Sequence, residues 1–253
     1  MSLLSYFLVT ALTACLTAIA GPVPVRSNTG FTRLSQDDVA LTWGPTLTTG
    51  RFSADITSFS TTTYPGAPPA TQKGGLFMWP GLINNDAGDL IQSIVGQYPP
   101  GQSECQGTNE DHEWCISSEV YHPSSSGTVQ LVGTKLTLDA NPTQGVKFVY
   151  KLTDGSKGDW TQTATDARTG TQLATYSYKS GQKNEFQIAV ECQDCTPTVN
   201  DSTYVDTVVT FASAVPDFAS QLYSGGGATY SKPTTSDGGK TWTISKITMP
   251  KMS

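Results

Sequence analysis

The sequence predicts an all-β protein, a β-sandwich or jelly roll of two antiparallel sheets, and three observations support this. Short runs rich in Thr, Val, Tyr and Phe alternate between apolar and polar residues, which is the period of a half-buried strand. Turn residues such as Asp154-Gly155 and Asp237-Gly238-Gly239 separate these runs. Only one weak helical period is present, at 217–223. Many short strands joined by frequent turns are typical of two-sheet sandwiches.

Six runs predict the strands in chain order. They cover residues 51–65, 127–140, 146–153, 161–179, 204–214 and 240–249. The Gly/Ser/Thr-rich stretch 224–239 predicts a loop, and residues 21–38 predict a loose N-terminal segment. Because no linker or repeat interrupts the rest, residues 39–253 are expected to form a single β-sandwich domain.

The first twenty residues form one apolar run that ends in Ala18-Ile19-Ala20. This small-x-small pattern before Gly21 predicts a cleaved signal peptide at 1–20, and hence a secreted, extracellular protein. A single membrane anchor is the alternative, because the run is close to the length of a spanning helix. After signal removal the chain is expected to be a monomer that does not associate with membranes.

Charge excludes some partners. Only 14% of residues are charged, the net charge is -6, and Lys and Arg form no cluster. Nucleic acid and anionic membrane surfaces are therefore not expected partners.

Four cysteines remain once Cys15 is removed with the signal peptide. The favoured pairing is Cys105–Cys115 and Cys192–Cys195, although four cysteines allow three connectivities. The Cys192-x-x-Cys195 spacing also occurs in redox and zinc sites. Those sites need an α/β context or a second matching pair, so a structural disulfide is favoured. Asn200-Asp201-Ser202 is a sequon for N-glycosylation at Asn200.

The chain has only two histidines, His112 and His122, and no G-x-S-x-G motif, so a serine-hydrolase triad is not indicated. Their spacing matches no zinc pattern, and no metal or other cofactor is expected.

Two apolar runs carry unexpected polar residues. In the run 184–192, Phe186, Ile188 and Val190 share one face, whereas Gln187 and Glu191 share the other. In the run 86–97, Gln92 lies between apolar neighbours. Each polar group is either buried with partners or exposed in a groove. For Glu191, the structural alternative is a charge that protects a strand edge from aggregation.

Six landmarks follow one another along residues 40–250. They are Trp79-Pro80-Gly81-Leu82, Leu90-Ile91-Gln92-Ser93, the stretch from Trp114 through Glu119 and Tyr121 to Pro123, Asp166 to Gly170, Asn184 to Glu191, and Val208 to Phe211. This collinear series resembles the fungal glutamic peptidases (eqolisins). The chain departs from the family's motifs at Ile83 and Asn84, and by two extra residues before Glu191.

The resemblance implies a concanavalin-A-like β-sandwich and a secreted endopeptidase that acts at acidic pH. Gln92 and Glu191 would be the catalytic pair. Glu191 would act as general base toward water and then protonate the leaving amine, and Gln92 would position the water and donate to the oxyanion. Five residues would shape the substrate groove: Trp79, Trp114, Glu119, Tyr121 and Gln187.

Other functions on the same sandwich remain open. A polysaccharide glycosidase would need a second acid such as Glu119, because Glu185 and Glu191 lie too far apart along one strand. A polysaccharide lyase would use Tyr176 or Tyr178 as base, but the four arginines offer little to neutralise a uronate. A non-catalytic, lectin-like glycan-binding protein is the third alternative. The expected partner is thus an extracellular polypeptide or polysaccharide.

Overall fold

The computed structural model describes residues 40–69, 74–84, 88–98, 105, 113–124, 127–133, 136–138, 144–195 and 200–252. The predicted signal peptide and the segment 21–38 lie outside these residues. No helix in the described ranges is long and apolar enough to cross a membrane.

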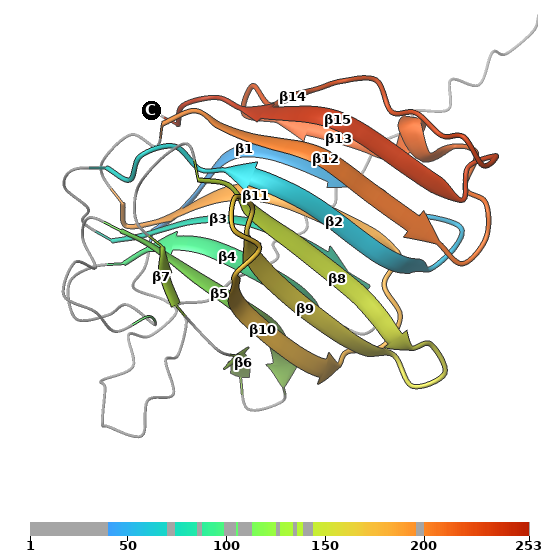
Figure 1. The fold of residues 1–253 in the computed structure, drawn as a ribbon, viewed down its shortest axis with the longest axis horizontal. Helices are drawn as coiled ribbons and strands as arrows, with labels where there is room; N and C mark the ends of the chain where they lie inside the picture. Colours follow the sequence, from blue (N-terminus) through green and yellow to red (C-terminus); the bar gives the residue numbers. More distant parts are fainter. Residues whose placement is uncertain are drawn as a thin grey trace, which may run out of the picture.

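Two antiparallel sheets pack face to face, which confirms the predicted β-sandwich (Figure 1). Within the described residues, sheet A has eight strands in the order β13-β1-β11-β3-β4-β5-β6, with β7 also paired to β5. Its strands are β1 (Leu41–Thr49), β3 (Gly75–Ile83), β4 (Leu90–Gln97), β5 (Trp114–Ser124), β6 (Gly127–Val132), β7 (Leu136–Leu138), β11 (Glu185–Gln193) and β13 (Leu222–Gly225).

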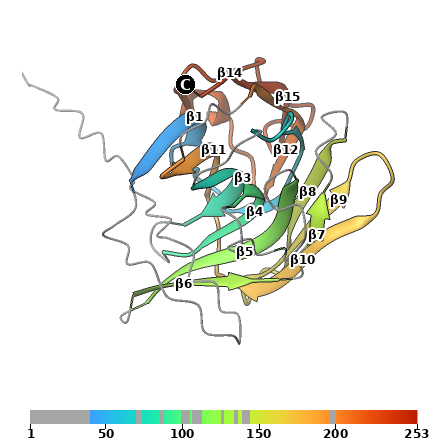
Figure 2. The same ribbon diagram turned by 90° about the vertical axis from the view of Figure 1, so that its left-hand side faces the viewer.

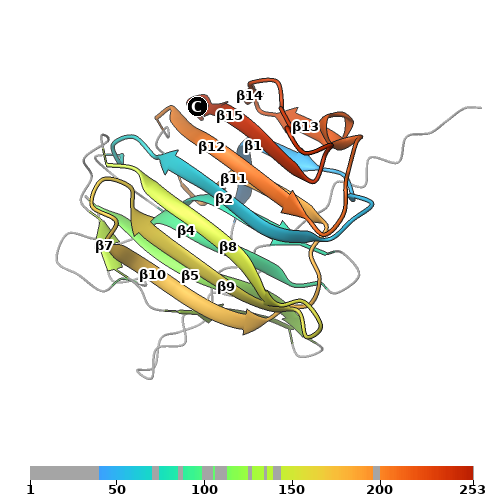
Figure 3. The ribbon, with the colours of Figure 1, turned by 45° about the vertical axis from the view of Figure 1, so that its right-hand side comes forward.

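Sheet B has seven strands in the described part of the chain, in the order β10-β9-β8-β2-β12-β15-β14. Figure 3 shows most of them side by side in front of sheet A. They are β2 (Ile56–Tyr64), β8 (Val146–Asp154), β9 (Asp159–Asp166), β10 (Gln172–Lys179), β12 (Ser202–Phe211), β14 (Thr229–Tyr230) and β15 (Thr241–Met249).

The six predicted runs all contain strands, but two neighbouring predictions need correction. The stretch 224–239, predicted to be a loop, includes the end of β13 and all of β14, and Thr234 also bridges Thr243. β13 and β14 are too short to show a hydrophobic alternation. They form because they pair by backbone hydrogen bonds with the edge strands β1 and β15. The weak helical period at 217–223 corresponds to a single 3₁₀ turn at Phe218–Gln221.

The main core lies between the sheets, and alternation along each strand builds it. On β11, Phe186, Ile188 and Val190 face this core. Phe186 packs against Phe59 of sheet B, with ring centroids 5.4 Å apart, and stacks near Phe52 at 6.3 Å. The core face predicted from the run 184–192 is therefore correct.

The opposite face of sheet A, here called the outer face, is also largely buried. It carries a second apolar cluster formed by Phe77, Trp79, Leu90, Ile94, Tyr98, Cys115, Tyr121 and Ala189. This explains why β3 and β4 are buried almost throughout: strands that are covered on both faces lose the simple alternation of buried and exposed residues. The candidate catalytic pair, Gln92 and Glu191, lies on this outer face.

Candidate functional site

Gln92 and Glu191 project from the outer face of sheet A and line the same small pocket. Phe77, Trp79, Ile94, Gln130 and Gln193 complete its lining, and its volume of about 10 Å³ is close to the minimum that one water molecule requires. Both side chains are buried, with Gln92 2% and Glu191 1% exposed. The pocket therefore brings together one carboxyl, three side-chain amides and the space of a single water.

The backbone positions of the pair are not adjacent. Gln92 of β4 lies opposite Gly81 of β3, which in turn pairs with Gln187 of β11. Glu191 is four residues farther along β11, or about 13 Å along the strand. The two long side chains thus reach the pocket from different levels of the sheet. Ala189, on the rung between them and opposite Trp79, is small and occupies little of the intervening space.

The Glu191 carboxyl is held by two donors. Trp79 Nε1 donates to Oε2 at 3.1 Å, and Gln193 Nε2 donates to Oε1 at 2.7 Å. Trp79 is itself braced by Trp43 of β1, with the two rings edge to face at 6.2 Å. Because each carboxyl oxygen can take a further hydrogen bond, the group remains able to contact a water or a substrate atom.

Burial raises the pKa of Glu191 to about 7, against the opposing effect of the hydrogen bonds from Gln193 and Trp79, and the Glu119 carboxyl raises it further. Glu191 is therefore mostly protonated under acidic conditions and titrates near neutrality. The sequence-based hypothesis made Glu191, in an acidic medium, first a general base toward water and then an acid toward the leaving amine. A carboxyl with this pKa instead rests as the acid there.

Glu119 lies beside Gln92, directly opposite it on β5. Its carboxyl is fully buried and accepts hydrogen bonds from Ser117 Oγ and from Gln130 Nε2. Gln130 lines the pocket, so the Glu119 side chain is linked to the pocket wall.

Gln92 has an unsatisfied acceptor: within the described residues its buried Oε1 has no hydrogen-bond partner. A buried amide oxygen without a donor is costly in free energy. A ligand that carries an O–H or N–H group would satisfy it.

Tyr150, from β8 of sheet B, places its hydroxyl between β3 and β4, next to the residue that follows Gln92. Pro80 has no N–H to contribute to the ladder, and the β3–β4 pairing has a gap between Met78 and Gly81, with the same register on either side. Tyr150 fills the gap: its hydroxyl accepts from the Ser93 N–H at 2.7 Å and donates to the Pro80 carbonyl at 2.6 Å. Burial raises the pKa of Tyr150 well above its ordinary value, so it stays a neutral donor.

Tyr150→Phe should lower the free energy of unfolding by about 1–3 kcal/mol, because it leaves both the Ser93 N–H and the Pro80 carbonyl without the hydrogen bond that Tyr150 makes. Urea unfolding measures this, with Tyr223→Phe as the control, since that side chain is 57% exposed. Equal losses in the two variants would contradict the bridging role of Tyr150.

The other candidate groove residues are divided between the two faces. Tyr121 belongs to the outer cluster, and Gln187, on the outer face, is half-buried beside Gly81. Trp114 was predicted to shape the groove but belongs to the core between the sheets, where its Nε1 donates to the Gly66 carbonyl at 2.9 Å. The reason is strand alternation: Trp114 is an odd number of residues from Glu119 and Tyr121 is an even number, so Trp114 faces the other way.

Both predicted disulfides, Cys105–Cys115 and Cys192–Cys195, are present. Asn200 is exposed just before β12, and its side-chain amide donates to the Ala67 carbonyl at 3.1 Å.

The histidine of the described ranges lies apart from the pocket. His122 Nδ1 is 2.6 Å from Asp89 Oδ1, and Ser180 Oγ donates to the other Asp89 oxygen at 3.1 Å. His112 lies outside the described residues. Among those described, no group of three or more His, Cys, Asp and Glu side chains could hold a metal ion.

Sequence reasoning missed Gln193, Gln130, Phe77 and Ile94 as pocket residues. Gln193 could have been found, because it continues the outer-face series Gln187, Ala189, Glu191 by two residues. Gln130 gave no comparable signal, since its approach to Glu119 depends on the pairing of β5 with β6.

Comparisons with solved structures return glutamic peptidases at low identity. One is a crystal structure of scytalido-glutamic peptidase with a peptide-based transition-state analog, with a TM-score of 0.45 and 13% identity over 82% of this chain and 98% of that chain. A second structure of that peptidase, with a transition-state analog inhibitor, has a TM-score of 0.44 and 14% identity over the same shares. SCP-B, a member of the eqolisin family of peptidases in complex with the tripeptide Ala-Ile-His, has a TM-score of 0.43 and 12% identity over 82% and 98%. No family model and no curated protein matches the sequence.

Proposed function

We propose that this protein is a secreted endopeptidase, active at acidic pH, that hydrolyses peptide bonds with Glu191 and Gln92. The observation that carries the proposal is the one-water pocket that both side chains line. The collinear series of motifs that resembles the glutamic peptidases supports the choice of a peptide bond as substrate.

The pKa of Glu191, about 7, suggests how a carboxyl would work in acid. In the protonated group, one oxygen gives its proton to the substrate carbonyl oxygen while the other takes a proton from the attacking water. The carboxyl stays neutral and the tetrahedral intermediate carries no net charge. It then protonates the leaving nitrogen and regains a proton from a hydroxyl of the intermediate, so that the C–N bond breaks and the acid and amine products form.

Gln92 would act at both ends of this step. Its unsatisfied Oε1 can accept a hydrogen bond from the attacking water, and its amide N–H can donate to the substrate carbonyl oxygen while that oxygen takes the proton from Glu191. A single donor to a full oxyanion contributes on the order of 10²–10³ in rate, which is the upper limit for a donor to an oxygen that is also protonated.

The test is digestion of a denatured protein library from about pH 3 to about pH 8 by the wild type and by Glu191→Gln. We expect wild-type cleavage at acidic pH that declines as the pH rises through about 7, because the acid form of Glu191 is then lost. Glu191→Gln should lose at least ~10³ in kcat/KM, since an amide cannot exchange protons in either step.

Glu185→Gln is the matched control. It lies on the same strand and face, where its carboxyl pairs with Arg51 at 3.6 Å, and it lies outside the pocket lining. Its variant should cleave at nearly the wild-type rate. Absence of cleavage by the folded wild type, or unimpaired cleavage by Glu191→Gln, would rule out the proposed peptidase.

A glycosidase is the second candidate, favoured by the electrostatic interaction of Glu119 with Glu191. Two carboxyls, one of them with a raised pKa, are the requirement for acid-assisted glycoside hydrolysis. Under this alternative, cleavage of an oligosaccharide would be lost in both Glu119→Gln and Glu191→Gln. The peptide library would remain intact.

A further inference from the structure

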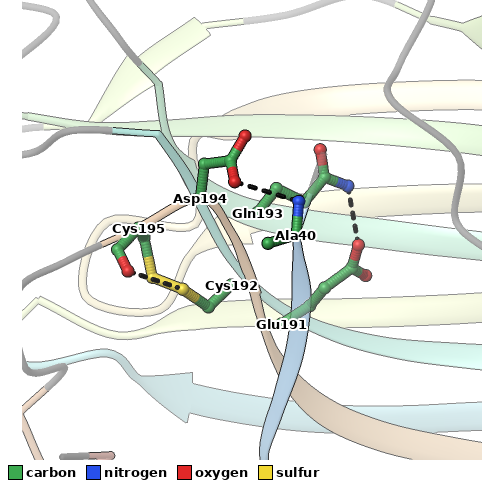
Figure 4. Close-up of a disulfide and its surroundings, with 6 residues drawn as sticks. All are labelled: Ala40, Glu191, Cys192, Gln193, Asp194 and Cys195. Carbon is green, nitrogen blue, oxygen red and sulfur yellow. Dashed lines mark hydrogen bonds between the residues drawn. A yellow bond between two sulfur atoms is a disulfide. The ribbon is translucent and has the colours of Figure 1, made fainter. Parts of the chain in front are cut away.

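Gln193 contacts the Glu191 carboxyl from within a closed loop. It lies two residues after Glu191 on the outer face of β11 and is 8% exposed. Its amide donates to Glu191 Oε1 at 2.7 Å (Figure 4). Since Trp79 holds the other oxygen, Gln193 and Trp79 together fix the rotation of the carboxyl about its last, otherwise soft, torsion.

The loop that contains Gln193 is tied at both of its ends. The Cys192–Cys195 disulfide closes a ring around Gln193 and Asp194. Asp194 has a φ of 53°, in the left-handed region that Asp tolerates better than most residues. It also exchanges hydrogen bonds with Ala40, donating its N–H to the Ala40 carbonyl at 2.9 Å and accepting the Ala40 N–H on Oδ1 at 2.9 Å.

The backbone of Gly74 packs closely against the backbone carbonyl of Gln193. Gly74 has a φ of 131°, and a Cβ at that position would lie 2.1 Å from the Gln193 carbonyl oxygen. Only glycine permits this approach. The backbone that carries the Gln193 side chain is thus held in three ways. Gly74, just before β3, packs against it, Ala40, just before β1, hydrogen-bonds to Asp194, and the Cys192–Cys195 disulfide closes the loop.

We propose that Gln193 is a positioning residue for Glu191, held in place by the Cys192–Cys195 loop, and that it orients the carboxyl and stabilises its ionised form. The inference rests on the proposed function for its catalytic meaning. The effect on ionisation is independent of that function: a donor to a carboxylate favours the charged form, and a donor fixed by a ring pays little entropy to provide it.

The direct test is the titration of Glu191 by NMR of the intact protein, with ¹³C-labelled glutamate and the Glu191→Gln variant to assign the signal. Gln193→Met keeps the length of the side chain and removes the donor. We expect it to raise the pKa of Glu191 further, by about tenfold in the ionisation constant, because a hydrogen bond to a charged group is lost. Gln193→Lys, which restores a donor and adds a positive charge, should lower this pKa below that of the wild type.

Gln172→Met is the matched control, since Gln172 is an exposed residue on sheet B, and its variant should titrate as the wild type does. The double variant Cys192→Ser, Cys195→Ser should shift the pKa of Glu191 in the same direction as Gln193→Met, by a smaller factor. An unchanged Glu191 titration in Gln193→Met, with its disulfide intact, would overturn the positioning role.

Kinetics separate this inference from the proposed function. If the wild type cleaves peptides, Gln193→Met should lower kcat, leave KM within about twofold, and move the pH profile with the Glu191 titration. A fall in activity without a shift in titration would mean that Gln193 contacts the substrate, and would overturn positioning. If the wild type does not cleave, the proposed function fails, whereas the titration still decides the role of Gln193.

Discussion

Wild-type protein is expected to lose about 3 kcal/mol of unfolding free energy as the pH rises from about 4.5 to above 7, and Glu191→Gln is expected to lack this loss. The pKa of Glu191 is about 7 in the folded protein and 4.5 for an ordinary glutamate. Between these values the folded state binds more protons than the unfolded state, so the stability falls with rising pH. Each tenfold difference in ionisation is worth about 1.4 kcal/mol, which gives the expected magnitude.

Urea unfolding at a series of pH values measures this effect, as the difference between the wild type and the variant. The profile of each protein by itself turns upward above about pH 7.5, because a second buried group titrates there with the opposite sign. Burial lowers the pKa of Lys183 to about 8 against the raising effect of Asp89, so stability rises again at more alkaline pH. Parallel pH profiles for the two proteins below pH 7.5 would show that Glu191 ionises as freely as it does in water.

Phe186→Ala should destabilise the fold by about 3–5 kcal/mol, the range for an aromatic residue lost from a packed core. Phe186 is 1% exposed and lies within 6.3 Å, centroid to centroid, of Phe52, Phe59 and Phe218. These rings come from different segments and cannot all move to fill the cavity. Urea unfolding at pH 5, where Glu191 is protonated in the folded state, gives the loss directly.

Gln187→Ala is the matched control for Phe186→Ala, because it is the next residue on β11 and faces the opposite side. It should change the free energy of unfolding by less than about 1 kcal/mol. Similar losses for the two variants would mean that the register of β11 is shifted by one residue, since such a shift exchanges the two faces.

Most of the fold prediction depended on the alternation of apolar and polar residues along individual strands. The runs at 146–153 and 204–214 became β8 and β12 because one face of each is polar and the other apolar. β14 could not be predicted in this way, since two residues are too few to show a period. Pairing supplies its stability, and pairing depends on residues distant in sequence.

The candidate site was predictable only in part for the same reason. Gln92 and Glu191 were conspicuous as polar groups within apolar runs, and Trp79 lay in a motif. The second apolar cluster on the outer face left no sequence signal separate from the main core. Trp114 was a different kind of error, because its odd spacing from Glu119 already placed it on the other face of the strand. The raised pKa of Glu191 depends on burial and on Glu119, neither of which a linear pattern reports.

The order of strands in sheet A also bears on how the protein reaches its native state. As Figure 2 shows, β1, β11, β3 and β4 lie next to one another, although β11 follows β4 by nearly ninety residues in the chain. β1 in turn needs both β11 and β13 as neighbours. Closing such long loops costs entropy before any contact repays it, and proteins dominated by such pairings fold in roughly milliseconds to seconds. The pocket therefore forms only after most of the chain has been synthesised, and a nascent chain that ends before β11 carries Gln92 without Glu191.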